Sequence, residues 1–300
     1  MVRPLQPLDL LALVFFDGRA NQARAWDCLD GEERALAMWP LLFRETLQPR
    51  GLRHTLVSSR RGRIGTLVSA RRRSGPKAWE VDHLFLAPGQ EGALPDNLEG
   101  LSAEAVRLRT ERVFLRLPAG SDLLDLARAA GFCPYRQETL YQFSGGDRPT
   151  SPQLVRPKTP EDEQALFHLY GAATPSSVRV AEGMTLEEWV HSKEPWSCRE
   201  LVSPGENCLV GWLRVTRRGK IGQFQALVRP DQPDKLGVLV DHCLGALRDQ
   251  PTIISLVADY EIALASALEA RGGRKTAEFV SLVRPLAARV SQPGLMPQQA

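Results

Sequence analysis

The sequence has 300 residues, of which 43% are apolar and 24% are charged, and its formal net charge is +3. This composition is typical of a folded globular protein and excludes a collagen-like, coiled-coil or disordered chain. At roughly 150 residues per domain, the length predicts two domains. The small net charge argues against a nucleic-acid-binding protein, which usually carries a stronger basic excess.

The cysteines and the N-terminal apolar run both fit a cytoplasmic protein. The five cysteines are scattered and none forms a C-x-x-C pair, so the sequence predicts reduced thiols and no metal site. The apolar run Leu10–Phe16 is too short to span a bilayer and lacks the basic segment and cleavage site of a signal peptide. We therefore expect a buried or amphipathic helix there, and no membrane association.

An internal repeat at an offset of 153 residues indicates a domain duplication. Residues 2–20 (VRPLQPLDLLALVFFDGRA) and 155–173 (VRPKTPEDEQALFHLYGAA) are identical at nine of nineteen positions. The order of later signals also recurs: a hairpin strand with a glycine, a third strand that ends at a proline, a helix, a short apolar strand and a helix closed by glycine. A period of this length is typical of two domains rather than of a solenoid.

The apolar periodicity and the turn residues predict the elements of the first copy in order. They are a strand at Val2–Pro4, a helix after Pro7, a helix within Glu32–Glu45, a hairpin of Thr55–Ser59 with Arg63–Ala70, a strand at Trp79–Ala87, a helix at Leu98–Thr110, a strand at Val113–Leu117, a helix from Ser121 to Ala130 and a strand within Cys133–Phe143. This alternation predicts an α/β (mixed α+β) fold, in which each domain is a mixed twisted sheet flanked by helices.

Composition also marks the boundaries between the two copies. Residues 144–152 (SGGDRPTSP) are rich in Gly, Pro and Ser, as linkers are. We therefore predict an N-terminal domain over 1–146, a linker over 147–153, a C-terminal domain over 154–290 and a flexible tail over 291–300.

This order of elements resembles the GNAT acyltransferase superfamily, as do Ile64-Gly65-Thr66-Leu67 in the hairpin and the helix that ends in Gly131-Phe132. The resemblance covers nearly the whole chain as a tandem pair. It implies that the strand Trp79–Ala87 diverges from its neighbour and that an acyl-CoA inserts into the gap. It also implies that amides of the next loop hold the pyrophosphate at a helix N-terminus. The implied cosubstrate is acetyl-CoA or another acyl-CoA, and the implied acceptor is a small-molecule or protein amine.

The resemblance assigns candidate acyl-CoA contacts to the strand ends and following loops of both copies. They are Leu86, Ala87, Gly89, Gly92 and Ala93 in the first copy, and Val228, Arg229, Lys235 and Gly237 in the second. Both loops depart from the family pattern R/Q-x-x-G-x-G/A. Glu91 and Asp96 bring negative charge to the first loop, and Asp231 and Asp234 to the second, where Pro233 also lacks an amide donor.

Glu80, Asp82 and His83 are the candidate catalytic residues. The resemblance implies a carboxylate base on their strand, whereas the second copy has Gln223 and Gln225 there, which cannot titrate. Strand alternation predicts Glu80 and Asp82 on one face and His83 on the other. Alternatively, the two carboxylates face solvent and His83 is a structural histidine.

Four tryptophans lie on or beside the first two helices of the two copies, namely Trp26, Trp39, Trp189 and Trp196. In the superfamily this region lines the acceptor cleft, so they are candidates for pocket walls. The alternative is packing in the core or between the domains. Trp212, beside Gly211 in the hairpin strand, is expected to be structural.

Two functions follow from these observations. The first is an acyl-CoA-dependent N-acyltransferase with at most one active site, in the N-terminal copy, because that copy keeps titratable residues on the central strand. The second is a non-catalytic tandem module that binds a metabolite or a protein partner. The degenerate loops favour it, as do Ala127 and Leu268, which stand where the superfamily often has a tyrosine.

Overall fold

The computed structural model describes residues 2–12, 16, 19–20, 53–60, 63–73, 77–146, 155–191, 198–206 and 208–286. The predicted helix within Glu32–Glu45, the linker 147–153 and the tail 291–300 lie outside these residues. We refer to residues 2–146 as the N-terminal half and to residues 155–286 as the C-terminal half.

The N-terminal half follows the predicted order of elements. They are β1 (Val2–Pro4), α1 (Asp9–Ala12), β2 (Arg19–Ala20), β3 (Arg53–Arg60), β4 (Arg63–Arg72), β5 (Ala78–Leu86), the 3₁₀ turn η3 (Glu91–Ala93), α3 (Leu94–Arg107), β6 (Arg112–Pro118), α4 (Leu123–Ala129) and β7 (Cys133–Ser144). Helix α3 begins earlier than predicted because Pro95 occupies its first turn, where a missing N–H costs nothing. Gly131, with φ +79°, follows the end of α4 as predicted.

The C-terminal half repeats this order, with five described α-helices against three in the described part of the N-terminal half. Its elements are β8 (Arg156–Pro157), η4 (Pro160–Asp162), α5 (Glu163–Ala173), α6 (Ser176–Glu182), α7 (Leu186–His191), β9 (Cys198–Pro204), β10 (Leu209–Arg218), β11 (Ile221–Val228), α8 (Asp234–Ala246), β12 (Thr252–Ala258), α9 (Ile262–Glu269) and β13 (Arg274–Pro285).

The sequence repeat corresponds to a repeated ion pair. Arg3 lies 2.5 Å from Asp9 in the N-terminal half, and Arg156 lies 2.7 Å from Asp162 in the C-terminal half, in both cases between Nη1 and Oδ2. Each carboxylate also accepts a backbone N–H three residues earlier, at 2.8 Å. The identical residues at offset 153 therefore hold the start of the first helix in the same way in both halves.

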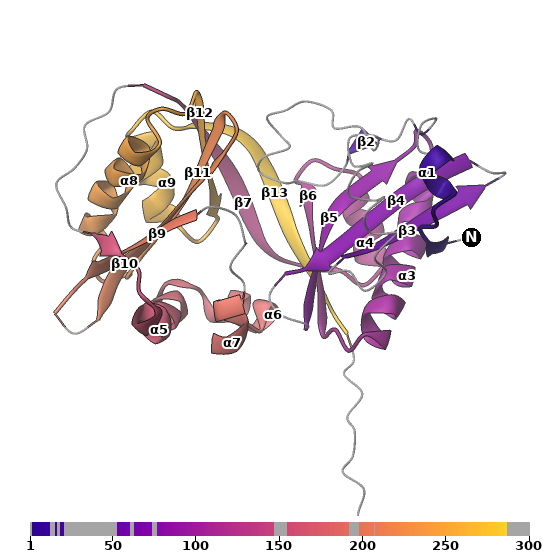
Figure 1. Ribbon diagram of the computed structural model, residues 1–300, viewed down its shortest axis with the longest axis horizontal. Coiled ribbons are helices and arrows are strands. Elements are labelled where there is room, and N and C mark those ends of the chain that lie inside the picture. The colour runs from indigo at the N-terminus through magenta and orange to yellow at the C-terminus, as the bar shows by residue number, and fades with distance from the viewer. Residues whose placement is uncertain are drawn as a thin grey trace, which may run out of the picture.

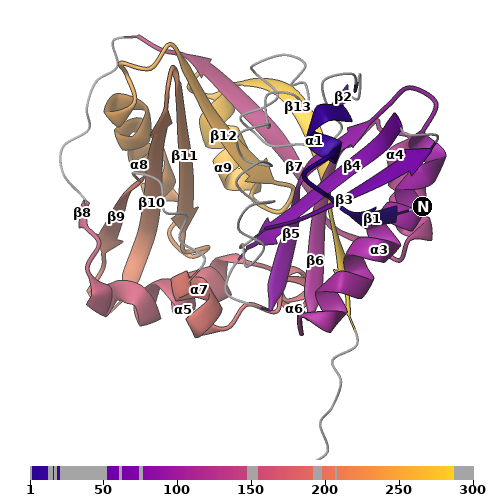
Figure 2. The same ribbon diagram turned by 45° about the vertical axis from the view of Figure 1, so that its right-hand side comes forward.

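The described strands form one sheet of thirteen strands that spans both halves. Strand β7 of the N-terminal half pairs with β12 of the C-terminal half, and β13 of the C-terminal half pairs with β6 of the N-terminal half. β7 and β13 also pair with each other, and both run through the middle of the molecule (Figures 1 and 2). The last strand of each half thus completes the sheet of the other half.

Both halves contain one parallel strand pair that separates after three residue pairs. Residues 78–80 of β5 pair with 112–114 of β6, and residues 221–223 of β11 pair with 252–254 of β12. The remaining residues of β5 and β11 pair only with their antiparallel neighbours within the described part of the sheet. In the C-terminal half this leaves a gap between two central strands, as the resemblance implied, whereas in the N-terminal half β2 pairs with Phe85 and Leu86 of β5 on the side that faces β6.

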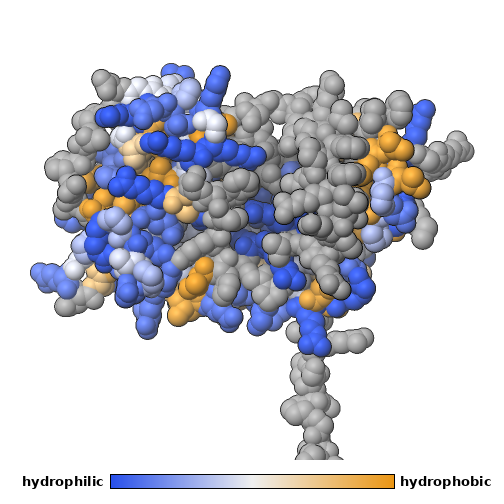
Figure 3. Space-filling model, viewed as in Figure 1, coloured by the Kyte–Doolittle hydropathy of each residue, from blue (hydrophilic) through white to orange (hydrophobic). Residues whose placement is uncertain are grey.

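Helices cover both faces of the sheet in the C-terminal half. Leucines of α8 and α9 pack into the larger core cluster with β10 and β11, whereas α5 packs on the opposite face, with α7 beside it (Figure 1). In the space-filling view, the described surface of this half is mainly hydrophilic, with small hydrophobic areas among the hydrophilic residues (Figure 3). Among the described residues, no helix has the length and apolar character that spanning a membrane requires.

Candidate active-site cleft

A cavity of about 220 Å³ lies in the C-terminal half, where β11 separates from β12. It opens on the face of the sheet that carries α5 and α7. Its lining residues come from β7, β9, β10, β11, β12 and the start of α9, and from α5 and α7. They are Arg136, Glu138, Tyr170, Thr174, Trp189, Glu200, Trp212, Arg214, Gln225, Ala226, Leu227, Leu256, Ala258, Tyr260, Glu261 and Leu264.

One wall of the cavity is aromatic. The ring centroids of Tyr170 and Trp189 lie 5.2 Å apart, and those of Trp189 and Trp212 lie 6.2 Å apart. Such spacings are favourable for aromatic pairs and hold the side chains rigidly. Trp189 is therefore a pocket residue as well as a packing residue, whereas Trp212, expected only to be structural, also lines the cavity. Trp26, Trp39 and Trp196 lie outside the described residues.

Glu261 lines this cavity, and its carboxyl group has a pKa close to neutral pH. It lies in the short turn between β12 and α9, and its Oε2 accepts the backbone N–H of Ala258 at 2.8 Å. Burial raises the pKa of Glu261 to about 7, although the Ala258 N–H and the charge of Arg136 act in the opposite direction. A carboxyl group with this pKa can accept a proton at neutral pH and release it again, as a general base requires.

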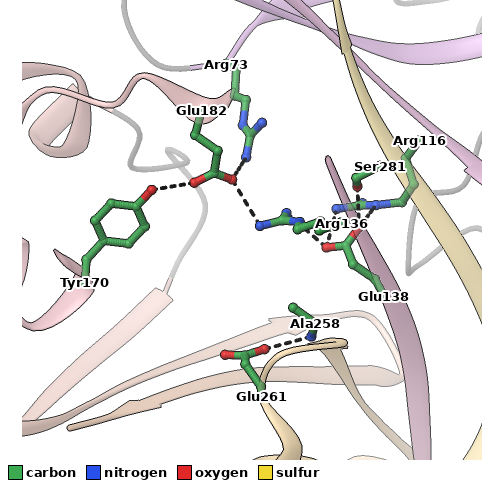
Figure 4. A network of polar contacts seen from close by, with 9 residues as sticks. All are labelled: Arg73, Arg116, Arg136, Glu138, Tyr170, Glu182, Ala258, Glu261 and Ser281. Atoms are coloured by element: carbon green, nitrogen blue, oxygen red, sulfur yellow. Dashed lines mark hydrogen bonds and ion pairs between the residues drawn. The ribbon is translucent and has the colours of Figure 1, made fainter. Parts of the chain in front are cut away.

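Two other carboxylates at or near the cavity, Glu138 and Glu182, belong to a network of ion pairs (Figure 4). Glu182 accepts the Tyr170 hydroxyl at 2.6 Å and lies 3.0 Å from Arg136. Arg136 in turn lies 3.0 Å from Glu138. Arg73, which follows β4 in the N-terminal half, also reaches Glu182. These carboxylates are held ionised by guanidinium groups, so they are poor proton acceptors, while Glu261 lies apart from them (Figure 4).

Glu138 is the most strongly held member of this network. Burial alone would raise its pKa, but the charges of Arg116 and Arg136, together with hydrogen bonds from Arg116 and Ser281, outweigh burial and lower the pKa to about 2. The Arg116 Nε and Ser281 Oγ lie 2.7 Å and 2.5 Å from the same carboxylate oxygen. Because β6, β7 and β13 supply these residues, the network joins the two halves where they exchange strands.

The predicted catalytic residues of the N-terminal half lie together on β5. Asp82 is buried and forms an ion pair with Arg53, and Glu80 lies 3.3 Å from Arg71. The prediction that His83 faces away from the two carboxylates is wrong. A bulge shifts the register so that Ser69 pairs with His83 and Ala70 with Val81, and this reverses the alternation after Asp82. His83 Nε2 consequently lies 3.9 Å from Asp82 Oδ2.

The predicted acyl-CoA contacts of the N-terminal half are engaged in local hydrogen bonds. After Leu86, the Ala87 N–H donates to the Gly65 carbonyl at 2.8 Å, and the Ala93 N–H donates to the Gln90 carbonyl at 3.0 Å. The Gly89 N–H donates to the Glu91 carboxylate at 3.2 Å. The Glu91 carboxylate therefore accepts the N–H that a phosphate oxygen would need. The other glycine of this loop, Gly92, is exposed.

The predicted contacts of the C-terminal half show a similar pattern. After Val228, the Arg229 N–H donates to the Val210 carbonyl at 2.9 Å, and the Arg229 side chain lies 3.0 Å from Asp231. Lys235 lies 3.8 Å from Asp234, and a Cβ at Gly237 would meet the Arg271 guanidinium at 2.8 Å. Several amides of these loops are engaged in local hydrogen bonds and acidic side chains lie beside them, so the loops fit the diphosphate of CoA poorly.

Sequence reasoning missed Glu261 because its chemistry depends on burial. The available signal was a carboxylate three residues after the apolar strand TIISLVA and directly before a helix, near the carboxyl end of a central strand. Among the described residues, no group of three or more His, Cys, Asp or Glu side chains is arranged to hold a metal ion.

Comparison with known proteins identifies the fold. No family model matches the sequence, and no curated protein matches it. A GCN5-related N-acetyltransferase from Sphaerobacter thermophilus is similar with a TM-score of 0.59 and 17% identity, over 96% of each chain. A tandem GNAT protein from the clavulanic acid biosynthesis pathway is similar with a TM-score of 0.52 and 16% identity, over 95% of this chain and 98% of that one. The chain therefore has a tandem GNAT fold, and the predicted fold class is confirmed.

Proposed function

We propose that this protein is an N-acyltransferase that moves an acyl group from an acyl thioester to an amine in the cleft of its C-terminal half. The observation that carries the proposal is Glu261, a carboxyl group with a pKa of about 7 in a cavity between two separating parallel strands. The sequence favoured the N-terminal half, where Glu80 and Asp82 are paired with arginines. We favour the C-terminal half because Glu261 forms no ion pair with any residue that the structure describes.

The proposed reaction needs one proton acceptor and one leaving thiolate. The amine nitrogen attacks the thioester carbonyl carbon, a C–N bond forms, and the C–S bond breaks. Glu261 accepts the proton that the amine loses. A thiol of ordinary pKa, about 8.5, holds a proton more tightly than a carboxyl group of pKa 7, so Glu261 can pass this proton to the departing thiolate.

The donor is proposed to bind mainly through its thioester arm. The strand gap beside Ala226 and Leu227 supports this part, because these residues lie where β11 no longer pairs with β12. The loops after β5 and β11 do not support a strong contact with a diphosphate. We therefore assign no residue to the nucleotide, and we expect acetyl-pantetheine to replace acetyl-CoA with little loss.

A non-catalytic module that binds a small ligand in the same cleft is the second candidate. The Glu91 carboxylate on the Gly89 amide favours it, since this contact blocks an anion site in the N-terminal half. Under this alternative a ligand would bind in the C-terminal cleft, but no thiol would be released from any acyl thioester.

The test is thiol release from acetyl-CoA and acetyl-pantetheine with a panel of amines. We expect turnover by the wild-type chain, with a rate that rises with pH through about 7 as Glu261 ionises. Glu261→Gln keeps the shape but cannot accept a proton, so we expect a loss of 10²- to 10⁴-fold and of that pH dependence. Glu80→Gln is the matched control and should retain the activity. Loss of activity in Glu80→Gln alone would move the site to the N-terminal half, and no thiol release with any amine would favour the ligand-binding module.

A further inference from the structure

Arg214 is a cation of the cleft that has no anionic partner among the described residues. It lies in the middle of β10, opposite Glu200 of β9 and Gln225 of β11, and it lines the cavity. Glu200 is instead 3.2 Å from Lys158. The other arginine of the cavity, Arg136, is held by two carboxylates. A half-buried guanidinium group without a counterion is a ready site for a carboxylate, which it binds through two parallel hydrogen bonds.

Trp212 supplies a second donor from the same strand and the same face. It precedes Arg214 by two residues, so both side chains point to the cavity side of β10. Trp212 is only 9% exposed, and its Nε1–H has no hydrogen-bond acceptor among the described residues. Buried indole N–H groups normally have an acceptor. The Nε1 atom is itself buried, so an oxygen of a bound ligand would fill this role after a small rotation of the indole ring.

The opposite side of the cavity has the proton acceptor. Glu261 comes from the turn between β12 and α9, whereas Arg214 and Trp212 come from β10, with β11 between them. Tyr170, Trp189, Leu227 and Leu256 add apolar area to the walls. The cavity thus combines donors for an anion, a base for an amine and an apolar middle. Its volume of about 220 Å³ is below the range of about 300–1,000 Å³ for drug-sized ligands, so a small metabolite fits.

We infer that the acceptor is a small amino carboxylate with an apolar side chain, whose carboxylate binds Arg214 and Trp212 while its amine faces Glu261. This inference rests on the proposed function and adds the class of acceptor. It sets free amino acids and related metabolites apart from simple amines. It also sets them apart from the side-chain amine of a lysine within a protein, which has no neighbouring carboxylate.

The test compares amino acids with their carboxamides, which keep the amine and side chain but lose the charge. The probes are leucine, phenylalanine and tryptophan, with leucinamide, phenylalaninamide and tryptophanamide, and the donor is acetyl-pantetheine. Charge-assisted hydrogen bonds of this kind predict a preference for the acid of about 10- to 100-fold in kcat/KM. Arg214→Gln should remove this preference while turnover of the amide stays within about threefold of wild type. Trp212→Phe should reduce the preference in part.

Arg217→Gln is the matched control, since Arg217 lies on the same strand but is exposed, donates to the Ala246 carbonyl and does not line the cavity. It should keep the full preference. Equal use of acids and amides by the wild-type chain would overturn the inference, even if acyl transfer itself occurs. If no amine is acylated, calorimetry with the same six compounds decides. Tighter binding of the acids, lost in Arg214→Gln, supports the carboxylate site without catalysis, and the absence of such a difference overturns it.

Discussion

Replacing Glu138 by Gln tests whether the buried network at the strand exchange stabilises the fold. Its side chain is 5% exposed, and its pKa falls from 4.5 to about 2 on folding because Arg116, Arg136 and Ser281 outweigh the effect of burial. The carboxylate therefore contributes stability that is present above pH 4.5 and is lost as the pH falls towards 2. A shift of this size corresponds to about 3 kcal/mol at pH 7 and about 2 kcal/mol at pH 3.5.

The assay is urea unfolding of the wild-type chain and of Glu138→Gln, followed by tryptophan fluorescence from pH 7 to pH 3.5. Glutamine has the shape of a protonated glutamic acid, so the variant reports on the same site without its charge. We expect the variant to be less stable by about 3 kcal/mol at pH 7, and the difference to narrow by about 1 kcal/mol at pH 3.5. A difference that is constant with pH, or one below 1 kcal/mol at pH 7, would refute this account of the network.

Two further outcomes follow from the fold. A chain cut within 147–153 should not yield two independent halves, because β7 completes the C-terminal sheet and β13 the N-terminal sheet. Coexpressed halves should copurify at a 1:1 ratio, while two separately soluble and folded monomers would contradict the exchange as a requirement for folding. Among the cysteines, Cys133 and Cys208 are exposed, whereas Cys243 is buried and burial raises the pKa of its thiol. Ellman's reagent should label the first two in the native protein and Cys243 only after denaturation. The variant Cys243→Ser should therefore release as much thionitrobenzoate as the wild-type chain under native conditions. A smaller native release from the variant would contradict the burial of Cys243.

The elements of the fold were predictable because their signals are local. The repeated Val-Arg-Pro segment, the apolar strands and the glycine after α4 each specify structure within a few residues, and the fold confirms them. The exchange of β7 and β13 was not predictable, since each strand has the same alternating pattern and would fit either half. Each of these strands could join either of two similar sheet edges, and the packing of the whole chain determines which edge it joins.

The candidate site was even harder to predict from the sequence than the strand exchange. The pKa of Glu261 depends on burial and on Arg136, which lies more than a hundred residues earlier in the chain. No sequence window contains both residues. The position of His83 depends on one extra residue in a strand, which reversed the expected alternation. Residue types on a single strand therefore pointed to the N-terminal half, whereas the cavity lies where residues from distant elements meet.

The exchange of strands also sets an order of events on the ribosome. β6 has β5 on one side, but its other neighbour is β13, which ends at Pro285. The nascent N-terminal half therefore leaves one edge of its sheet open until the chain has been synthesised as far as Pro285. An open strand edge can pair with other chains, so this interval is the one in which the protein is most exposed to aggregation. The N-terminal half is made first, but its sheet is completed last.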